Sequence, residues 1–156
     1  MLKRVRTIAD FQFGKGAGIG LFPDEVEFQV STTGRVRQIL LSGRRLATLR
    51  ARDGRFTLSI EGATRLKESL PPPAYRVVIQ DDVAEFILRG KNAFARHVLD
   101  ADPGIRAGDE VMVVNTKGEL LGTGAAALSG REMLAFNYGV AVNVRQGRES
   151  GCFQEE

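Results

Sequence analysis

The chain has 156 residues, of which 43% are hydrophobic and 26% charged, with a formal net charge of +3. This composition predicts a globular protein, and no apolar run approaches the ~18–20 residues that a membrane-spanning helix needs. We expect no secretory leader, because the basic residues at the start are not followed by an apolar segment. The single cysteine, Cys152, excludes an internal disulfide, so we expect a reduced, cytoplasmic protein.

Positive charge is concentrated in the first half of the sequence. Residues 1–78 hold 14 Lys and Arg against 7 Asp and Glu, a net charge of +7, whereas residues 79–156 hold 8 against 12, a net charge of −4. A dense group of arginines is typical of a surface that binds a polyanion, although a solvated face of a sheet would also accommodate it. The group comprises Arg35, Arg37, Arg44, Arg45, Arg50, Arg52 and Arg55.

The first half predicts an antiparallel meander with two helices. Alternating apolar residues indicate strands, Asp53-Gly54 is a strong hairpin signal, and Phe56, Leu58 and Ile60 are expected to face the core. The predicted elements are a helix over 7–13, a glycine-rich loop over 14–20, strands over 26–30, 35–41, 45–51 and 55–60, and a helix over 63–70.

Three consecutive prolines, Pro71 to Pro73, cannot donate backbone hydrogen bonds and favour a stiff, extended path. We therefore place a domain boundary there, with one domain over 1–73, a second over 74–147 and a disordered tail over 148–156. In the second domain Ser129 and Glu132 have the spacing of a capping box at a helix start. Its predicted elements are strands over 75–79, 94–99, 111–114, 119–128 and 140–144, and helices over 83–88 and from 129 to Gly139.

No set of residues predicts catalysis, a metal site or a cofactor. His97 is the sole histidine, which excludes a two-histidine metal site, and we interpret it as a structural residue in a strand. Cys152 lies in the predicted tail, where no base is held beside it. The run Gly14 to Gly20 lacks the strand, helix and Gly-Lys-Ser/Thr of a phosphate loop. It is interpreted as a turn, with approach to an RNA phosphate as the alternative.

The second half resembles a PUA domain, an RNA-binding module. The resemblance rests on the Arg-Gly-Lys-Asn motif at 89–92 and on residues 89–98, 101–102, 105–114, 122–124 and 128–133. It implies a pseudo-barrel of strands with two helices, in which RNA meets the first helix and the following loop. The residues so implicated are Arg89, Gly90, Lys91, Asn92 and Phe94, with Arg145 as a weaker candidate. On its residue type, Phe94 is interpreted as core.

The first half resembles the domain that precedes the PUA domain in archaeal archaeosine tRNA-guanine transglycosylases. This resemblance rests on residues 9–18, 21–23 and 57–63. The sequence holds neither the catalytic barrel of those enzymes nor their catalytic carboxylates and zinc-binding cysteines. The resemblance therefore implies the RNA-binding domains of those enzymes without their catalytic activity.

Together these observations predict an α+β chain that consists of a meander domain followed by a PUA pseudo-barrel. The favoured hypothesis is a non-catalytic protein that binds RNA, most plausibly tRNA, through phosphates, sugars and shape. It could act as an accessory to a separate catalytic subunit of tRNA modification. The alternative is a protein-interaction adaptor that has lost its RNA affinity. The predicted RNA-binding residues are Arg89, Gly90, Lys91, Asn92, Arg145, Arg35, Arg37, Arg44, Arg45, Arg50 and Arg52.

Overall fold

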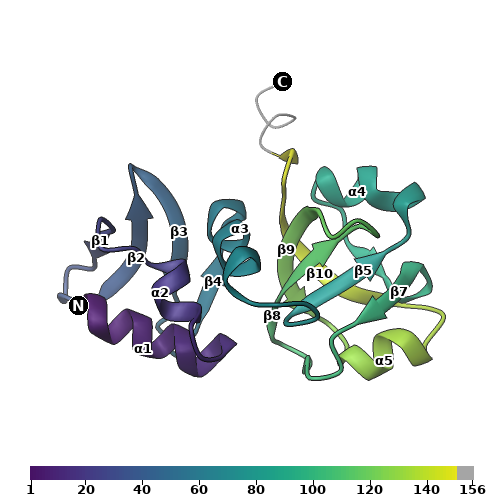
Figure 1. Cartoon of the computed structure of the whole chain (residues 1–156), viewed down its shortest axis with the longest axis horizontal. Helices are drawn as coiled ribbons and strands as arrows, with labels where there is room; N and C mark the ends of the chain where they lie inside the picture. Colours follow the sequence, from purple (N-terminus) through teal and green to yellow (C-terminus); the bar gives the residue numbers. More distant parts are fainter. Residues whose placement is uncertain (151–156) are drawn as a thin grey trace. The chain divides into compact units, whose positions relative to one another are not determined.

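The computed structural model describes residues 1–150 and divides the chain into two compact units (Figure 1). The first unit is Met1–Pro71 and the second begins at Pro72. The division therefore falls within the proline run, two residues before the boundary expected from the sequence. None of the helices among residues 1–150 combines the length and apolar character needed to cross a membrane.

The first unit is a four-stranded antiparallel meander with helices, and the strand order β1-β2-β3-β4 follows the chain. This arrangement confirms the predicted sheet. The elements are α1 (Leu2–Phe13), α2 (Ala17–Leu21), β1 (Glu27–Val30), β2 (Val36–Leu41), β3 (Arg44–Leu49), β4 (Phe56–Leu58) and α3 (Ile60–Ser69).

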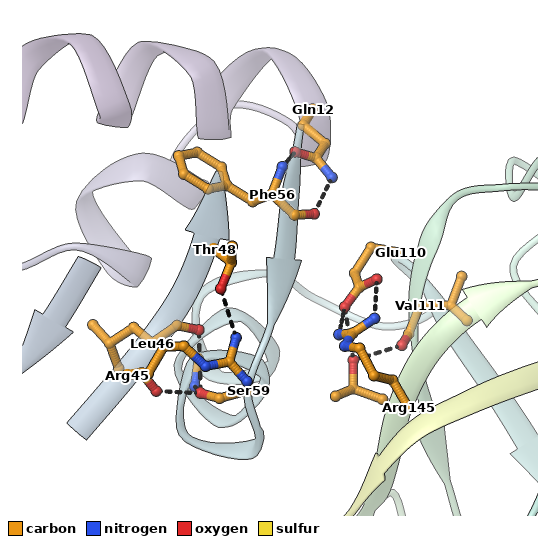
Figure 2. Close-up of polar contacts among 11 residues, drawn as sticks. Gln12, Arg45, Leu46, Thr48, Phe56, Ser59, Glu110, Val111 and Arg145 are labelled. Carbon is orange, nitrogen blue, oxygen red and sulfur yellow. Dashed lines mark hydrogen bonds and ion pairs between the residues drawn. The ribbon is translucent and has the colours of Figure 1, made fainter. Parts of the chain in front are cut away.

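Side chains from the helices and from β2–β4 form the core of this unit. In α1, Val5, Ala9 and Phe13 recur every four residues and are buried, as expected for one face of a helix. The side chain of Gln12 donates to the carbonyl of Phe56 at 2.9 Å and accepts from its N–H at 2.7 Å, which fastens α1 to β4 (Figure 2).

Three predictions for this unit are wrong. The first helix, expected over 7–13, begins at Leu2. Residues 17–20, expected in a loop, lie in α2, and a Cβ at Gly18 would overlap the carbonyl oxygen of Arg6. Glycine is present there because α2 packs directly on the backbone of α1. Ile60, expected in a strand, begins α3, because the hydroxyl of Ser59 accepts from the N–H of Gly62 and caps the helix.

The second unit is a six-stranded mixed sheet in the order β6-β10-β9-β8-β5-β7, in which β5 and β8 are parallel and the other pairs antiparallel. Its elements are β5 (Arg76–Ile79), η1 (Asp81–Val83), α4 (Ala84–Leu88), β6 (Ala93–Phe94), η2 (Ala95–His97), β7 (Val98–Ala101), β8 (Glu110–Val114), β9 (Leu120–Ala126), α5 (Gly130–Ala135) and β10 (Val140–Gly147).

This sheet curls into a nearly closed barrel, which confirms the predicted pseudo-barrel. The two edge strands, β6 and β7, are separated in the chain by the three residues of η2 alone. Three residues span only ~10 Å, so the edges of the sheet have to approach one another. Figure 1 shows α4 at one end of these strands and α5 at the other.

The details of the second unit agree with the sequence in part. The capping box of Ser129 and Glu132 is confirmed, with both reciprocal hydrogen bonds present. The strand expected over 94–99 is interrupted by η2, and α5 ends at Ala135, before the expected Gly139. In the predicted tail, the N–H groups of Arg148 and Glu149 donate to Leu121 and Leu88. Residues 151–156, which include Cys152, lie outside the described residues.

Asp81 fastens η1 to the turn between β8 and β9. Its carboxylate accepts from the hydroxyl of Thr116 at 2.6 Å and from its N–H at 3.0 Å. These two bonds, the hydroxyl foremost, hold the pKa of Asp81 below its ordinary value.

A depressed folded-state pKa gives a stabilisation that is present above the unfolded-state pKa of ~3.9 and is lost as the pH falls through the folded-state pKa. We therefore expect Asp81→Asn to lower the free energy of unfolding at pH 7, and the gap to the wild type to close towards pH 2. Urea unfolding across this range measures the gap. A gap that stays constant with pH would contradict this account.

Candidate nucleic-acid interface

A groove of about 320 Å³ opens in the second unit between α4 and the segment formed by β6 and η2. Its volume lies at the lower end of the range typical of ligand pockets. Apolar side chains make most of the lining, and polar groups are few and placed together. The lining residues are Ile79, Val83, Phe86, Ile87, Lys91, Asn92, Ala93, Phe94, Arg96 and His97.

Two aromatic rings at this groove face solvent. Phe86 is 53% exposed and Phe94 is 41% exposed, so the interpretation of Phe94 as core is wrong. Its neighbour on β6, Ala93, is buried, so the alternation of the strand turns the Phe94 ring away from the barrel interior. The guanidinium of Arg96 lies 5.8 Å from the centroid of the Phe94 ring, and the ring of His97 meets it edge-on at 6.4 Å. Exposed rings beside cations are the groups on which nucleobases stack.

The loop after α4 brings two predicted residues to the same groove. Gly90 adopts a φ of +94°, and the N–H of Lys91 donates back to Phe86 at 2.9 Å. The Oδ1 of Asn92 accepts from the N–H of Val144 at 3.0 Å, which holds the loop against β10. Lys91 and Asn92 are exposed, and the ammonium of Lys91 has no ion-pair partner within residues 1–150.

The two arginines predicted with this loop do not line the groove. Arg89 pairs with Glu85, one turn earlier on α4, at 2.6 Å. Arg145 forms a two-pronged ion pair with Glu110, whose side chain is only 4% exposed (Figure 2). The Arg145 guanidinium is therefore engaged in an ion pair within the protein.

The arginines of the first unit are divided between the two ends of the β2–β3 hairpin. Arg35, Arg37 and Arg50 line a groove of about 700 Å³ at the open end. Arg44 and Arg45 follow the tight turn at the other end, since Leu41 pairs with Arg44. Arg45 pairs with Leu40, three residues beyond Arg37. At ~3.3 Å per residue, the nearest members of the two sets are therefore ~10 Å apart along the strand. Arg52, in the turn between β3 and β4, does not line the groove.

Several of these arginines already have partners. Arg50 binds Asp53 through two hydrogen bonds of 3.1 and 2.6 Å. Desolvation acts to raise the pKa of Asp53, but the Arg55 N–H and the charge and hydrogen bonds of Arg50 outweigh it and lower that pKa. Arg45 is half-buried and donates to the hydroxyl of Thr48 at 3.0 Å, as Figure 2 shows, and Arg44 lies 3.9 Å from Glu61.

Reasoning from the sequence missed four residues that line the two grooves. In the second unit they are Phe86, Arg96 and His97, the last of which had been interpreted as a structural residue. In the first unit the missed residue is Arg4 of α1. Arg96 could have been found from the sequence, because it lies two residues after Phe94 and such residues share a face in a strand. In the structure η2, and not a continued strand, brings both residues to one groove. Among the described residues no cluster of three His, Cys, Asp or Glu side chains could hold a metal ion.

Comparison with known protein families identifies the domain family of each unit. Residues 3–73 match the patch-forming domain C2 of tRNA-guanine transglycosylase, and residues 75–148 match the PUA domain. The chain belongs to these two domain families. The groove between α4 and β6–η2 is therefore in the PUA domain, and the arginine-lined groove is in the C2 domain. The resemblance drawn from the sequence is confirmed in both halves.

Similar curated proteins and a similar solved structure agree with this domain assignment. The chain is 51% identical over 150 residues to the tRNA-guanine(15) transglycosylase of Pyrococcus abyssi, and 51% over 147 residues to that of Thermococcus kodakarensis. These matches cover 96% and 94% of this chain, which spans about a quarter of the length of each relative (25%). A hypothetical protein of Pyrococcus horikoshii has a similar structure, with a TM-score of 0.76, 25% identity, and coverage of 99% of this chain and 93% of that one.

Proposed function

We propose that this chain is a non-catalytic RNA-binding module that grips tRNA, with the PUA groove as its principal site. The observation that carries the proposal is the combination in one groove of Lys91, which has no ion pair among residues 1–150, the amide of Asn92 and the exposed Phe94–Arg96 pair. A cation that meets a phosphate and a ring that meets a base are the two elements of single-strand RNA recognition.

The names of the relatives support tRNA as the RNA. Those relatives are tRNA-guanine(15) transglycosylases, and the chain corresponds to about a quarter of their length. We propose that the chain supplies RNA grip in trans to a separate catalytic subunit of tRNA modification. Its own described residues offer binding groups rather than an arrangement of acid, base and nucleophile.

The test is tRNA binding followed by fluorescence anisotropy, with Lys91→Glu/Arg96→Glu as the variant. We expect its Kd to rise at least ~10-fold, and the salt slope to fall because two phosphate contacts are lost, at ~0.7–0.9 per contact. Both residues are exposed, so the thermal midpoint should stay within a few degrees.

Arg106→Glu/Arg131→Glu is the matched control, because it makes the same charge change at exposed positions outside the groove. It should weaken binding less than ~3-fold. Equal losses in the two variants would show that net charge alone governs affinity. Failure of the wild type to bind tRNA at low salt would overturn the proposal and favour the adaptor alternative.

A further inference from the structure

We propose that the groove of the C2 domain is a second RNA site, which takes a nucleotide-sized segment of single-stranded RNA. This inference rests on the proposed RNA-binding function and adds to it a separate site with its own ligand class. The groove lies between the first half of α1 and the open end of the β2–β3 hairpin, where Met1, Val5 and Ile8 face residues 33–37 and 49–51.

The charge of the groove is positive and only partly compensated within the described residues. Arg4, Arg35, Arg37 and Arg50 line it, and no Asp or Glu does. Arg50 is neutralised by Asp53, whereas the guanidinium groups of Arg4, Arg35 and Arg37 are exposed and make no ion pair in the described part of the chain. Guanidinium groups kept together without acidic partners favour a bound anion, and the planar fork of arginine matches phosphate.

The spacing of these cations suits a strand of phosphates. Arg35 directly precedes β2 and Arg37 is the second residue of that strand. In extended backbone two such positions are ~6.6 Å apart, with their side chains on the same side. This separation is comparable with that of adjacent phosphates in an extended RNA strand. Arg4 reaches the groove from α1, on the opposite wall. Gly34 and Gly54 leave bare backbone at the groove, with open space where a Cβ would project.

The floor of the groove is an aliphatic surface against which a nucleobase can pack. Val5 is buried, Ile8 and Leu49 are half-buried, and all three line the groove together with the arginines. A flat base covering this aliphatic surface would remove it from water, at ~25 cal/mol for each Å² buried. The volume of about 700 Å³ is within the range of nucleotide-sized ligand pockets. A double helix presents its phosphates on a wide outer surface and could not place a base on this floor, so the geometry selects a single strand.

The experiment uses the full chain and a fluorescein-labelled oligouridylate of eight nucleotides at low salt. We expect Arg35→Ala/Arg37→Ala to weaken binding at least ~10-fold and to lower the salt slope by ~1.4, the value for two contacts on a single strand. Arg4→Ala, on the opposite wall, should weaken binding several-fold. Arg44→Ala/Arg52→Ala removes two arginines of the same domain that lie outside the groove, and it should change Kd less than 2-fold.

The outcomes separate this inference from the proposed function. If oligouridylate binding responds to Lys91→Glu/Arg96→Glu but not to Arg35→Ala/Arg37→Ala, the C2 site is overturned while the PUA site stands. If an octamer of glutamate competes as well as the oligonucleotide, the groove is a site for acidic peptides and the inference fails. Protection of Arg35 and Arg37 by oligouridylate, and not by a hairpin duplex, against an arginine-specific reagent such as phenylglyoxal would support it.

Discussion

Arg145→Ala should lower the free energy of unfolding of the PUA domain by about 2–3 kcal/mol. Removing one partner of a buried ion pair costs about 3–5 kcal/mol, because the other charge remains buried without compensation. Arg145→Ala would take the arginine away from Glu110, whose side chain is 4% exposed and whose two oxygens face the guanidinium. The Thr123 hydroxyl, 3.4 Å from Glu110 Oε2, would still contact the carboxylate. The estimate is reduced because the Arg145 side chain is 35% exposed, which lets water reach the carboxylate once the arginine is gone.

Chemical denaturation of the single and double variants measures this effect. Glu110→Gln in the Arg145→Ala background removes the buried negative charge and should restore at least half of the lost stability. tRNA affinity at a temperature where both proteins are folded should change less than 3-fold, because the groove does not include Arg145. A large loss of affinity with unchanged stability would instead return Arg145 to the RNA-binding residues.

Gly147→Ala should cost about 3 kcal/mol or more and should disturb the loop that carries Lys91. A Cβ at Gly147 would overlap the carbonyl oxygens of Ile87 and Leu88 and the nitrogen of Gly90. These are backbone atoms at the end of α4, so they cannot move aside as a side-chain tip can. Overpacking a well-filled interior ordinarily costs about 1–3 kcal/mol, and three backbone overlaps place this position at or beyond the upper end.

Thermal unfolding and RNA binding together test this prediction. The tRNA affinity of Gly147→Ala should fall even where the protein is still folded, because β10 and the Gly90 loop would be pushed apart. Gly104→Ala is the matched control in the same domain, since its Cβ would approach only the side chain of Asp102. If the free energy of unfolding of Gly147→Ala is within ~0.5 kcal/mol of the wild type, β10 can shift to accommodate the Cβ and the prediction fails.

The prediction for Gly147 concerns how the PUA groove is held in place. The Asn92 side chain and the close approach of Gly147 fasten the Gly90 loop to β10, while Asp81 ties η1 to the β8–β9 turn. The loop therefore presents Lys91 from a braced position rather than from a free segment. Preorganisation of this kind reduces the entropy that is lost when RNA binds.

The sequence by itself determined the fold class, the meander, the capping box at Ser129 and the family. These features depend on local signals, such as alternating apolar residues, turn dipeptides and cap residues, which act over a few neighbouring positions. For the same reason Lys91 and Asn92 could be selected before the structure, because their motif is contiguous in the chain.

Only the tertiary structure decided which charges are available and which rings face solvent. Strand register separated Arg35 and Arg37 from Arg44 and Arg45, and a partner 35 positions away engaged Arg145. The exposure of Phe94 followed from the face of β6 on which its side chain lies, opposite to the buried Ala93. Burial and ion pairing depend on contacts between residues distant in the chain, and an arginine has the same identity in the sequence whether it faces a carboxylate or open water.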